Sequence, residues 1–413
     1  MLESNQIIVR GSRANITKFY VSSVLGGFTL FHGVLGFYMR QIGFSYTQFF
    51  FLAALYEMLV FLLEIPTGVY ADRVGLKKSA VLGHFISAAS CFPIALYPTS
   101  YSVFLLWSVL SAICTTLNSG SVEALQFESL RDISLEAEFT KFRGRFAAIG
   151  GLSMPVGAAL GGVLCENIGF GKVVALGGLT GLFIAAVYVS MSEPREVQLA
   201  RESLTAQSIF KRIAENFRFI KKDRELTGVI IAGSVVYAAY LLINNYSQPC
   251  LEEARIQSYR IVGLVSGTFM LAFAAVSWWA GYLTQRIGAK GIFLWLSGVP
   301  ILSLVGLGKL KGTTLLAPLY LSRLGEGVAE PVISNRLLQK SPVGKSATLL
   351  STHSLLTSLV FSIWSMASGF GLDNVGRTFT FSAGAAFALI ILLWSGRLVV
   401  RTNDLNSPNR AGY

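Results

Sequence analysis

The sequence contains few charged residues and few cysteines. Only 14% of its 413 residues are charged, against about 25% in a typical soluble domain. The four cysteines have neither paired nor metal-like spacing, and most of them lie in apolar stretches, where cysteine behaves as a small hydrophobe. These features argue against one large soluble core, a disulfide framework and a cysteine-based metal site. The four are Cys91, Cys114, Cys165 and Cys250.

Motifs of enzymes and nucleotide hydrolysis are also missing from the sequence. It has no His-Glu-x-x-His zinc pattern, no phosphate-binding glycine loop ending in Lys-Ser/Thr, and no recognisable catalytic serine or aspartate pair. The net charge of +12 could suggest nucleic acid, but the basic residues are spread over alternate loops rather than gathered in one domain. We therefore expect neither an enzyme nor a nucleic-acid-binding protein, and no cofactor or metal.

Long apolar stretches dominate what is present. Hydrophobic residues make up 53% of the chain, and runs of about 20 of them recur, enough to cross about 30 Å of hydrocarbon. The first run is too long for a cleavable signal peptide and is expected to act as the insertion signal. The sequence predicts an all-α membrane protein with twelve transmembrane helices, near residues 18–39, 46–67, 78–97, 101–126, 144–166, 170–191, 226–248, 257–284, 289–309, 313–338, 345–370 and 377–397.

The distribution of Lys and Arg predicts the orientation. Most of them lie in alternate loops and helix ends, which the positive-inside rule places in the cytoplasm together with both termini. The polar segment 193–225 alternates basic and apolar residues at helical spacing, so we expect an amphipathic linker on the inner membrane surface, with a docking site for a regulator as the alternative. It would join six-helix bundles at 1–192 and 226–413. We expect a monomer in the plasma (inner) membrane.

A charged turn between the second and third predicted helices has an ordered pattern. Gly68, Asp72, Arg73, Gly75 and Lys77 fit G-x-x-x-D-R-x-G-x-K. Glycine at the first position lets a neighbouring helix approach, and glycine in the turn permits a positive φ. The aspartate can accept backbone N–H groups at a helix N-terminus. The turn resembles the signature loop between helices 2 and 3 of the major facilitator superfamily, which implies two six-helix bundles and a role as a conformational switch.

The second half of the chain carries a degraded copy of this turn, in which an amide replaces the acid. A further match aligns Glu123 in the fourth predicted helix with Glu330 in the tenth. Parallel six-helix repeats are typical of major facilitator transporters, so the resemblance extends over essentially the whole chain. The copied residues are Gly281, Gln285, Arg286, Gly288 and Lys290.

The fifth predicted helix has a glycine-rich run that is similar to the antiporter-associated motif of the family. Met154 stands where a glycine would precede Pro155. Small residues at this spacing allow close helix contact and bending. The resemblance implies export by antiport, although the fourth helix lacks the arginine often found in proton-coupled members.

Ionisable residues inside the predicted spans are candidate proton or substrate sites, because each costs at least about 2.5–3.5 kcal/mol at the bilayer centre. Arg323, Glu326 and Glu330 share one face of the tenth helix, and either line a central cavity or form a structural ion pair. Glu57, in the middle of the second helix, is the leading proton-site candidate. Glu123 is expected in the cavity or in a cytoplasmic gate, paired with Arg or Lys.

Uncharged or weakly basic polar residues complete the candidate cavity. Each of them could bind a substrate or could equally bond a neighbouring helix. They are His32, Asn118, Tyr240, Asn244 and Asn245.

The sequence thus predicts a secondary active transporter that moves a small organic molecule by alternating access. A proton or other ion gradient would drive it, because no nucleotide-binding loop is present. Export is favoured, and the charge balance of the candidate cavity favours cationic or zwitterionic compounds. The alternatives are an ion-coupled uptake permease, a transporter-like receptor without net transport, and an intramembrane enzyme.

Overall fold

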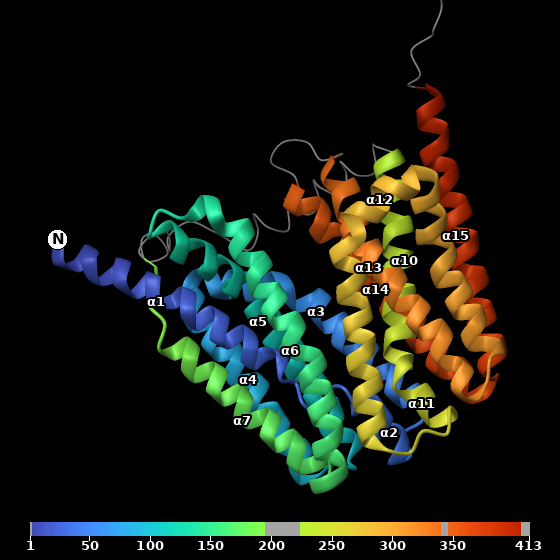
Figure 1. The fold of residues 1–413 in the computed structure, drawn as a ribbon, viewed down its shortest axis with the longest axis horizontal. Coiled ribbons are helices and arrows are strands. Elements are labelled where there is room, and N and C mark those ends of the chain that lie inside the picture. The colour runs from blue at the N-terminus through green and yellow to red at the C-terminus, as the bar shows by residue number, and fades with distance from the viewer. Residues whose placement is uncertain (1, 195–223, 340–345, 406–413) are drawn as a thin grey trace, which may run out of the picture. The chain divides into compact units, whose positions relative to one another are not determined.

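The computed structural model describes residues 2–194, 224–339 and 346–405, and every regular element in these ranges is helical. Two short 3-10 turns lie at Glu136–Glu138 and Gly312–Leu315. The helices, drawn in Figure 1, are α1 (Leu2–Gly27), α2 (Leu35–Gln41), α3 (Tyr46–Val74), α4 (Leu76–Leu96), α5 (Tyr101–Arg131), α6 (Phe139–Ile168), α7 (Phe170–Val189), α10 (Arg224–Ser247), α11 (Pro249–Glu253), α12 (Tyr259–Lys309), α13 (Leu316–Gln339), α14 (Ser346–Asn374) and α15 (Arg377–Leu405).

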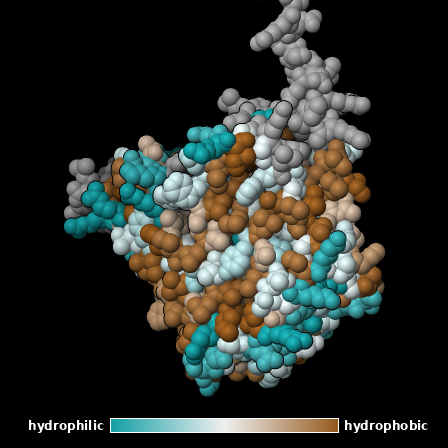
Figure 2. Space-filling model, turned by 45° about the vertical axis from the view of Figure 1, so that its right-hand side comes forward, coloured by the Kyte–Doolittle hydropathy of each residue, from teal (hydrophilic) through white to brown (hydrophobic). Residues whose placement is uncertain are grey.

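Each predicted span lies on a helix, although α3 and α15 extend well beyond the predicted ends and the first span is broken. Among the described residues, nine helices are long and apolar enough to cross a membrane. The predicted spans outside these nine are the first, the ninth, of which the search of the described residues covers the apolar helix Trp295–Lys309, and the charged α13. On the face drawn in Figure 2, hydrophobic side chains cover the middle and hydrophilic ones gather at the lower end. This distribution is typical of a surface that contacts lipid.

The prediction of a single first helix at 18–39 is wrong. α1 ends at Gly27, and α2 begins only at Leu35. The intervening backbone lies against α6, where a Cβ on Gly161 would come within 1.6 Å of the Leu30 carbonyl oxygen. A Cβ on Gly157 would come within 2.6 Å of the Gly27 carbonyl oxygen. The glycine-rich run therefore makes the predicted close contact, and its partner is an interrupted helix.

The eighth and ninth predicted spans are two helices that meet at a kink within α12. The predicted turn between them is present as a kink, because Gly288 has φ 69° and ψ 174° inside the element. Only glycine adopts such angles readily.

The chain divides into two compact units. The first comprises Met1–Ser208 and Gln248–Leu271, and in it α4 packs against α5 and α7 while α1 packs against α6. The second comprises Ile209–Ser247 and Ala272–Tyr413, and in it α10 packs against α13, α14 and α15. Among the nine apolar helices of the described residues, α10 is consequently the most enclosed, with 67% of its 18-residue apolar stretch buried. The predicted linker falls largely outside the described residues, so the boundaries of the two predicted bundles stay a prediction.

Candidate functional site

The second unit contains a group of polar side chains around Glu326 of α13. Arg323 Nη1 donates a hydrogen bond to Glu326 Oε2 at 3.0 Å, one helical turn away. Asn244 Nδ2, on α10, donates to the same oxygen at 2.7 Å. The Glu326 side chain is only 7% exposed and that of Arg323 20%. The cation and the amide together offset part of the free-energy cost of burying this carboxylate.

Polar atoms beside this pair have no partner among the described residues. They are the Tyr240 hydroxyl, Arg323 Nε and the Ser322 hydroxyl, all buried. Tyr240 lies directly against α13, because a Cβ on Gly325 would come within 2.4 Å of its hydroxyl oxygen. Buried polar atoms are nearly always hydrogen-bonded, so unpaired ones are notable and available to a bound molecule. We call Tyr240, Asn244, Arg323 and Glu326 the Glu326 cluster.

Two neighbouring candidates are not part of the Glu326 cluster. Glu330 is exposed and forms no hydrogen bond or ion pair within the described part of the chain. Asn245 Nδ2 donates to the Leu241 carbonyl oxygen of its own helix at 2.9 Å. The structure thus brings together Arg323, Glu326 and Asn244, and it leaves Glu330 and Asn245 outside this group.

The acidic candidates of the first unit have different surroundings. Glu123 Oε2 lies 3.7 Å from Arg143 Nη2 of α6, with side chains 53% and 36% exposed. Arg143 Nη1 also donates to Gln126 Oε1 at 3.1 Å. This pairing is of the kind expected for a gate, and that role stays a prediction. Glu57 is half-buried on α3, next to Tyr56, and its role in proton transfer likewise stays a prediction.

Asn118 and His32 both lie in packed surroundings. A Cβ on Gly83 of α4 would come within 2.5 Å of Asn118 Oδ1, so this amide fills the space between α4 and α5. His32 lies in the break between α1 and α2, with its ring centroid 4.3 Å from that of Phe31 and 6.0 Å from that of Trp107. For Asn118, the contacts favour the helix-packing alternative.

The turn with the signature pattern joins α3 to α4. Gly75 has φ 111° and ψ 146°, which confirms the predicted positive φ, and Gly288 at the matching position of the repeat also has a positive φ. A Cβ on Gly68 would meet no atom within 4 Å, so the close helix approach predicted there is not present. Asp72 is exposed, and the acceptor for the Lys77 backbone N–H is instead Glu193 Oε1, at 3.3 Å.

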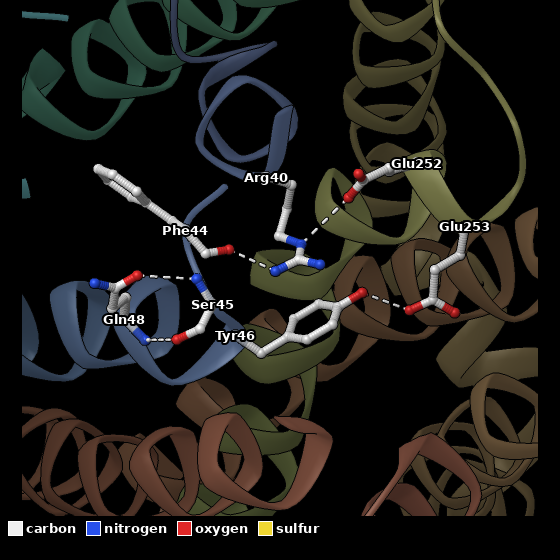
Figure 3. A network of polar contacts seen from close by, with 7 residues as sticks. All are labelled: Arg40, Phe44, Ser45, Tyr46, Gln48, Glu252 and Glu253. Atoms are coloured by element: carbon white, nitrogen blue, oxygen red, sulfur yellow. Dashed lines mark hydrogen bonds and ion pairs between the residues drawn. The ribbon is translucent and has the colours of Figure 1, made fainter. Parts of the chain in front are cut away.

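A second polar network, shown in Figure 3, was missed by the sequence analysis. Arg40 Nε lies 3.2 Å from Glu252 Oε2, and its guanidinium stacks 4.0 Å above the ring of Tyr46. The Tyr46 hydroxyl donates to Glu253 Oε1 at 2.5 Å. We call these four residues the α2–α11 clamp. No local pattern predicts it, because its two sides lie more than 200 residues apart in the sequence.

Further contacts extend the α2–α11 clamp within the first unit. Gln248 Oε1 accepts from the Gly36 backbone N–H, and its Nε2 donates to the His32 carbonyl oxygen, both at 2.7 Å. The start of α12 lies against α6, because a Cβ on Gly263 would come within 2.5 Å of the Ala158 carbonyl oxygen. Residues 248–271 are thus held by both hydrogen bonds and small-residue packing.

Comparison with known proteins identifies the family. The sequence model of the Major Facilitator Superfamily matches residues 19–365. This chain belongs to the major facilitator superfamily. It is 25% identical over 412 residues to the uncharacterized MFS-type transporter YxaM of Bacillus subtilis (strain 168), an alignment that covers 94% of this chain and 97% of that protein.

Two further similarities agree with this membership. Over 334 residues the chain is 20% identical to the inner membrane transport protein YajR of Escherichia coli (strain K12), covering 80% of this chain and 70% of that protein. The crystal structure of the nucleoside transporter NupG has the same fold, with a TM-score of 0.72 at 11% identity and coverage of 93% and 98%.

Family membership confirms the predicted fold of twelve transmembrane helices and a multi-pass membrane protein. It also establishes membrane transport as the general function, since members of this family are transporters rather than enzymes.

Proposed function

We propose that this protein is a secondary active transporter that exports a small organic molecule by alternating access, driven by a proton gradient. The observation that carries the proposal is the Glu326 cluster. Its carboxylate is almost fully buried in a membrane protein and is held by donors from two helices. Because ionisable groups are costly inside a membrane, those that occur there commonly mark substrate or ion pathways.

The Glu326 cluster offers a chemical route for coupling. Arg323 Nη1 and Asn244 Nδ2 both donate to Glu326 Oε2. A proton on this carboxylate would weaken both bonds and release the two donors. The released donors, together with the unpaired Tyr240 hydroxyl, could then bind acceptor groups of a substrate. A zwitterionic compound would match both charge signs of the cluster, and a cationic one would match the Glu326 carboxylate alone.

Alternating access requires contacts that form in one state and break in another. The α2–α11 clamp supplies contacts of this kind, because partly exposed ion pairs such as Arg40–Glu252 contribute little individually and can be exchanged at low cost. With both termini in the cytoplasm, as the Lys and Arg distribution favours, the clamp lies on the outer side and the turn with Asp72 on the inner side. The similarity to YajR, an inner membrane transport protein, supports an inner-membrane location.

Everted membrane vesicles provide the test. A screen of cationic and zwitterionic compounds should find at least one that accumulates in the vesicles, and a protonophore should abolish the accumulation. Glu326→Gln should remove the proton dependence, while the matched control Glu330→Gln, at an exposed position outside the cluster, should keep it.

Other outcomes would favour the alternatives. Accumulation only in right-side-out vesicles indicates an uptake permease, and saturable binding without accumulation indicates a receptor. Wild-type proton dependence in Glu326→Gln would contradict the role of the cluster, and the same measurement on Glu57→Gln would then test the second candidate for the proton site.

A further inference from the structure

A groove of about 570 Å³ lies between α4 and α7 in the first unit. Its walls are apolar, and some of the side chains that form them are exposed. Phe85 is 55% exposed and Val189 56% exposed. In a membrane protein, such a surface faces lipid acyl chains. The apolar lining residues are Val81, Leu82, Phe85, Leu182, Ala185, Ala186 and Val189.

One end of the groove is basic. Lys77 and Lys78 line it, in the first turn of α4. Cations at this position are unfavourable for the helix itself, because the N-terminus of a helix already carries partial positive charge. Neither ammonium group has an ion-pair partner within the described residues.

The remaining charges around the lysines do not neutralise them. Glu193 Oε1 accepts the Lys77 backbone N–H at 3.3 Å and contributes one negative charge. Asp72 and Arg73, both exposed in the last turn of α3, add one charge of each sign to the same end. This end of the groove therefore has a surplus of positive charge, which is complementary to an anion.

We propose that the groove binds an anionic glycerophospholipid. The phosphate lies at the ammonium groups of Lys77 and Lys78, and an acyl chain lies along the apolar walls of α4 and α7. Basic pockets at the cytoplasmic ends of transmembrane helices suit anionic head groups. The lipid comes from the leaflet that adjoins the α3–α4 turn, which is the cytoplasmic leaflet in the orientation proposed above. The binding itself is independent of the transport proposal.

Lipid retention by the purified full-length protein tests the site. The protein is incubated in mixed micelles of phosphatidylglycerol and phosphatidylcholine, and the lipids that stay bound are measured by native mass spectrometry. The wild type should retain phosphatidylglycerol with a preference that falls at least about tenfold in Lys77→Gln/Lys78→Gln. The matched control Lys141→Gln/Arg145→Gln removes two exposed positive charges from α6 and should keep the preference.

The variant Ala186→Trp distinguishes binding of a lipid from binding of a free anion. This substitution fills the apolar part of the groove and leaves both lysines in place, so it should also reduce retention of phosphatidylglycerol. If the double lysine variant does not fold, the comparison of Ala186→Trp with the wild type still tests the proposal. Equal losses in the two double variants, full retention in Ala186→Trp, or displacement of the lipid by millimolar inorganic phosphate would each overturn the proposal.

Discussion

Two acidic residues on repeat-related helices, Glu123 on α5 and Glu326 on α13, differ sharply in their surroundings. Glu326 is 7% exposed and lies 3.0 Å from Arg323, whereas Glu123 is 53% exposed and lies 3.7 Å from Arg143. The first carboxylate also has an amide donor from another helix. A buried pair is costly to break, while an exposed pair contributes little, so we expect the same type of substitution to have very different effects at the two places.

The repeat itself explains why the contrast is informative. Gly75 and Gly288 both have a positive φ at matching places, so the two halves share backbone geometry at the signature turn. The two halves differ instead in how the charged residues of their predicted spans are paired and buried. The two units therefore differ in their polar interiors, and the second contains the Arg323–Glu326 pair, whose carboxylate side chain is only 7% exposed.

The substitution expected to have the largest effect is Arg323→Gln. It removes the cation and leaves Glu326 buried with the Asn244 amide as its remaining partner, which should destabilise the protein by about 3–5 kcal/mol and abolish transport. Thermal unfolding in detergent and vesicle transport would measure the two effects.

Adding Glu326→Gln to Arg323→Gln tests the cause of that loss. The double variant has no buried unpaired charge, so it should regain most of the stability and none of the transport. A double variant no more stable than Arg323→Gln would show that the guanidinium acts through packing rather than through the charge pair.

Asn244→Leu should have the next largest effect. It removes a hydrogen bond to a charged group, which contributes about 1.5–3 kcal/mol. Asn245→Leu is the matched control, because among the described residues that amide bonds only a carbonyl oxygen of its own helix. Melting temperatures of the two variants would measure the difference. Equal shifts would show that the hydrogen bond from Asn244 to Glu326 does not stabilise the protein.

The fold was largely predictable from the sequence, while the site was predictable only in part. Apolar runs of sufficient length define most spans, and the turn at Gly75 follows from glycine in a fixed pattern. The break after Gly27 was not predictable, because it depends on contact with glycines more than 100 residues away.

For the site, helical spacing predicted the pairing of Arg323 with Glu326, which are three residues apart. It could not predict which asparagine of α10 reaches them or how Arg40 meets Glu252, since both contacts depend on tertiary packing.

Arg40→Gln examines an intermediate case. Arg40 and Glu252 are 20% and 41% exposed, between the values for the other two pairs, so loss of this ion pair should cost only about 0.5–1 kcal/mol. A larger relative change is expected in transport, because the α2–α11 clamp is proposed to open in each cycle. Glu252→Gln removes the same pair from the other side and should change the transport rate in the same direction. Opposite changes would contradict a shared role in the clamp.

Glu123→Gln should have the smallest effect on stability, below about 0.5 kcal/mol, because both side chains of the pair are exposed and 3.7 Å apart. The contribution of the Glu123–Arg143 pair to stability should decrease as the salt concentration is raised, unlike that of the buried Arg323–Glu326 pair. Melting temperatures at low and high salt would measure it, with Glu138→Gln, which breaks another exposed pair at 2.9 Å, as the control. If Glu123→Gln lost stability like Arg323→Gln, burial would not be what distinguishes the two halves. A selective loss of transport at full stability would instead indicate that Glu123 acts as the predicted gate.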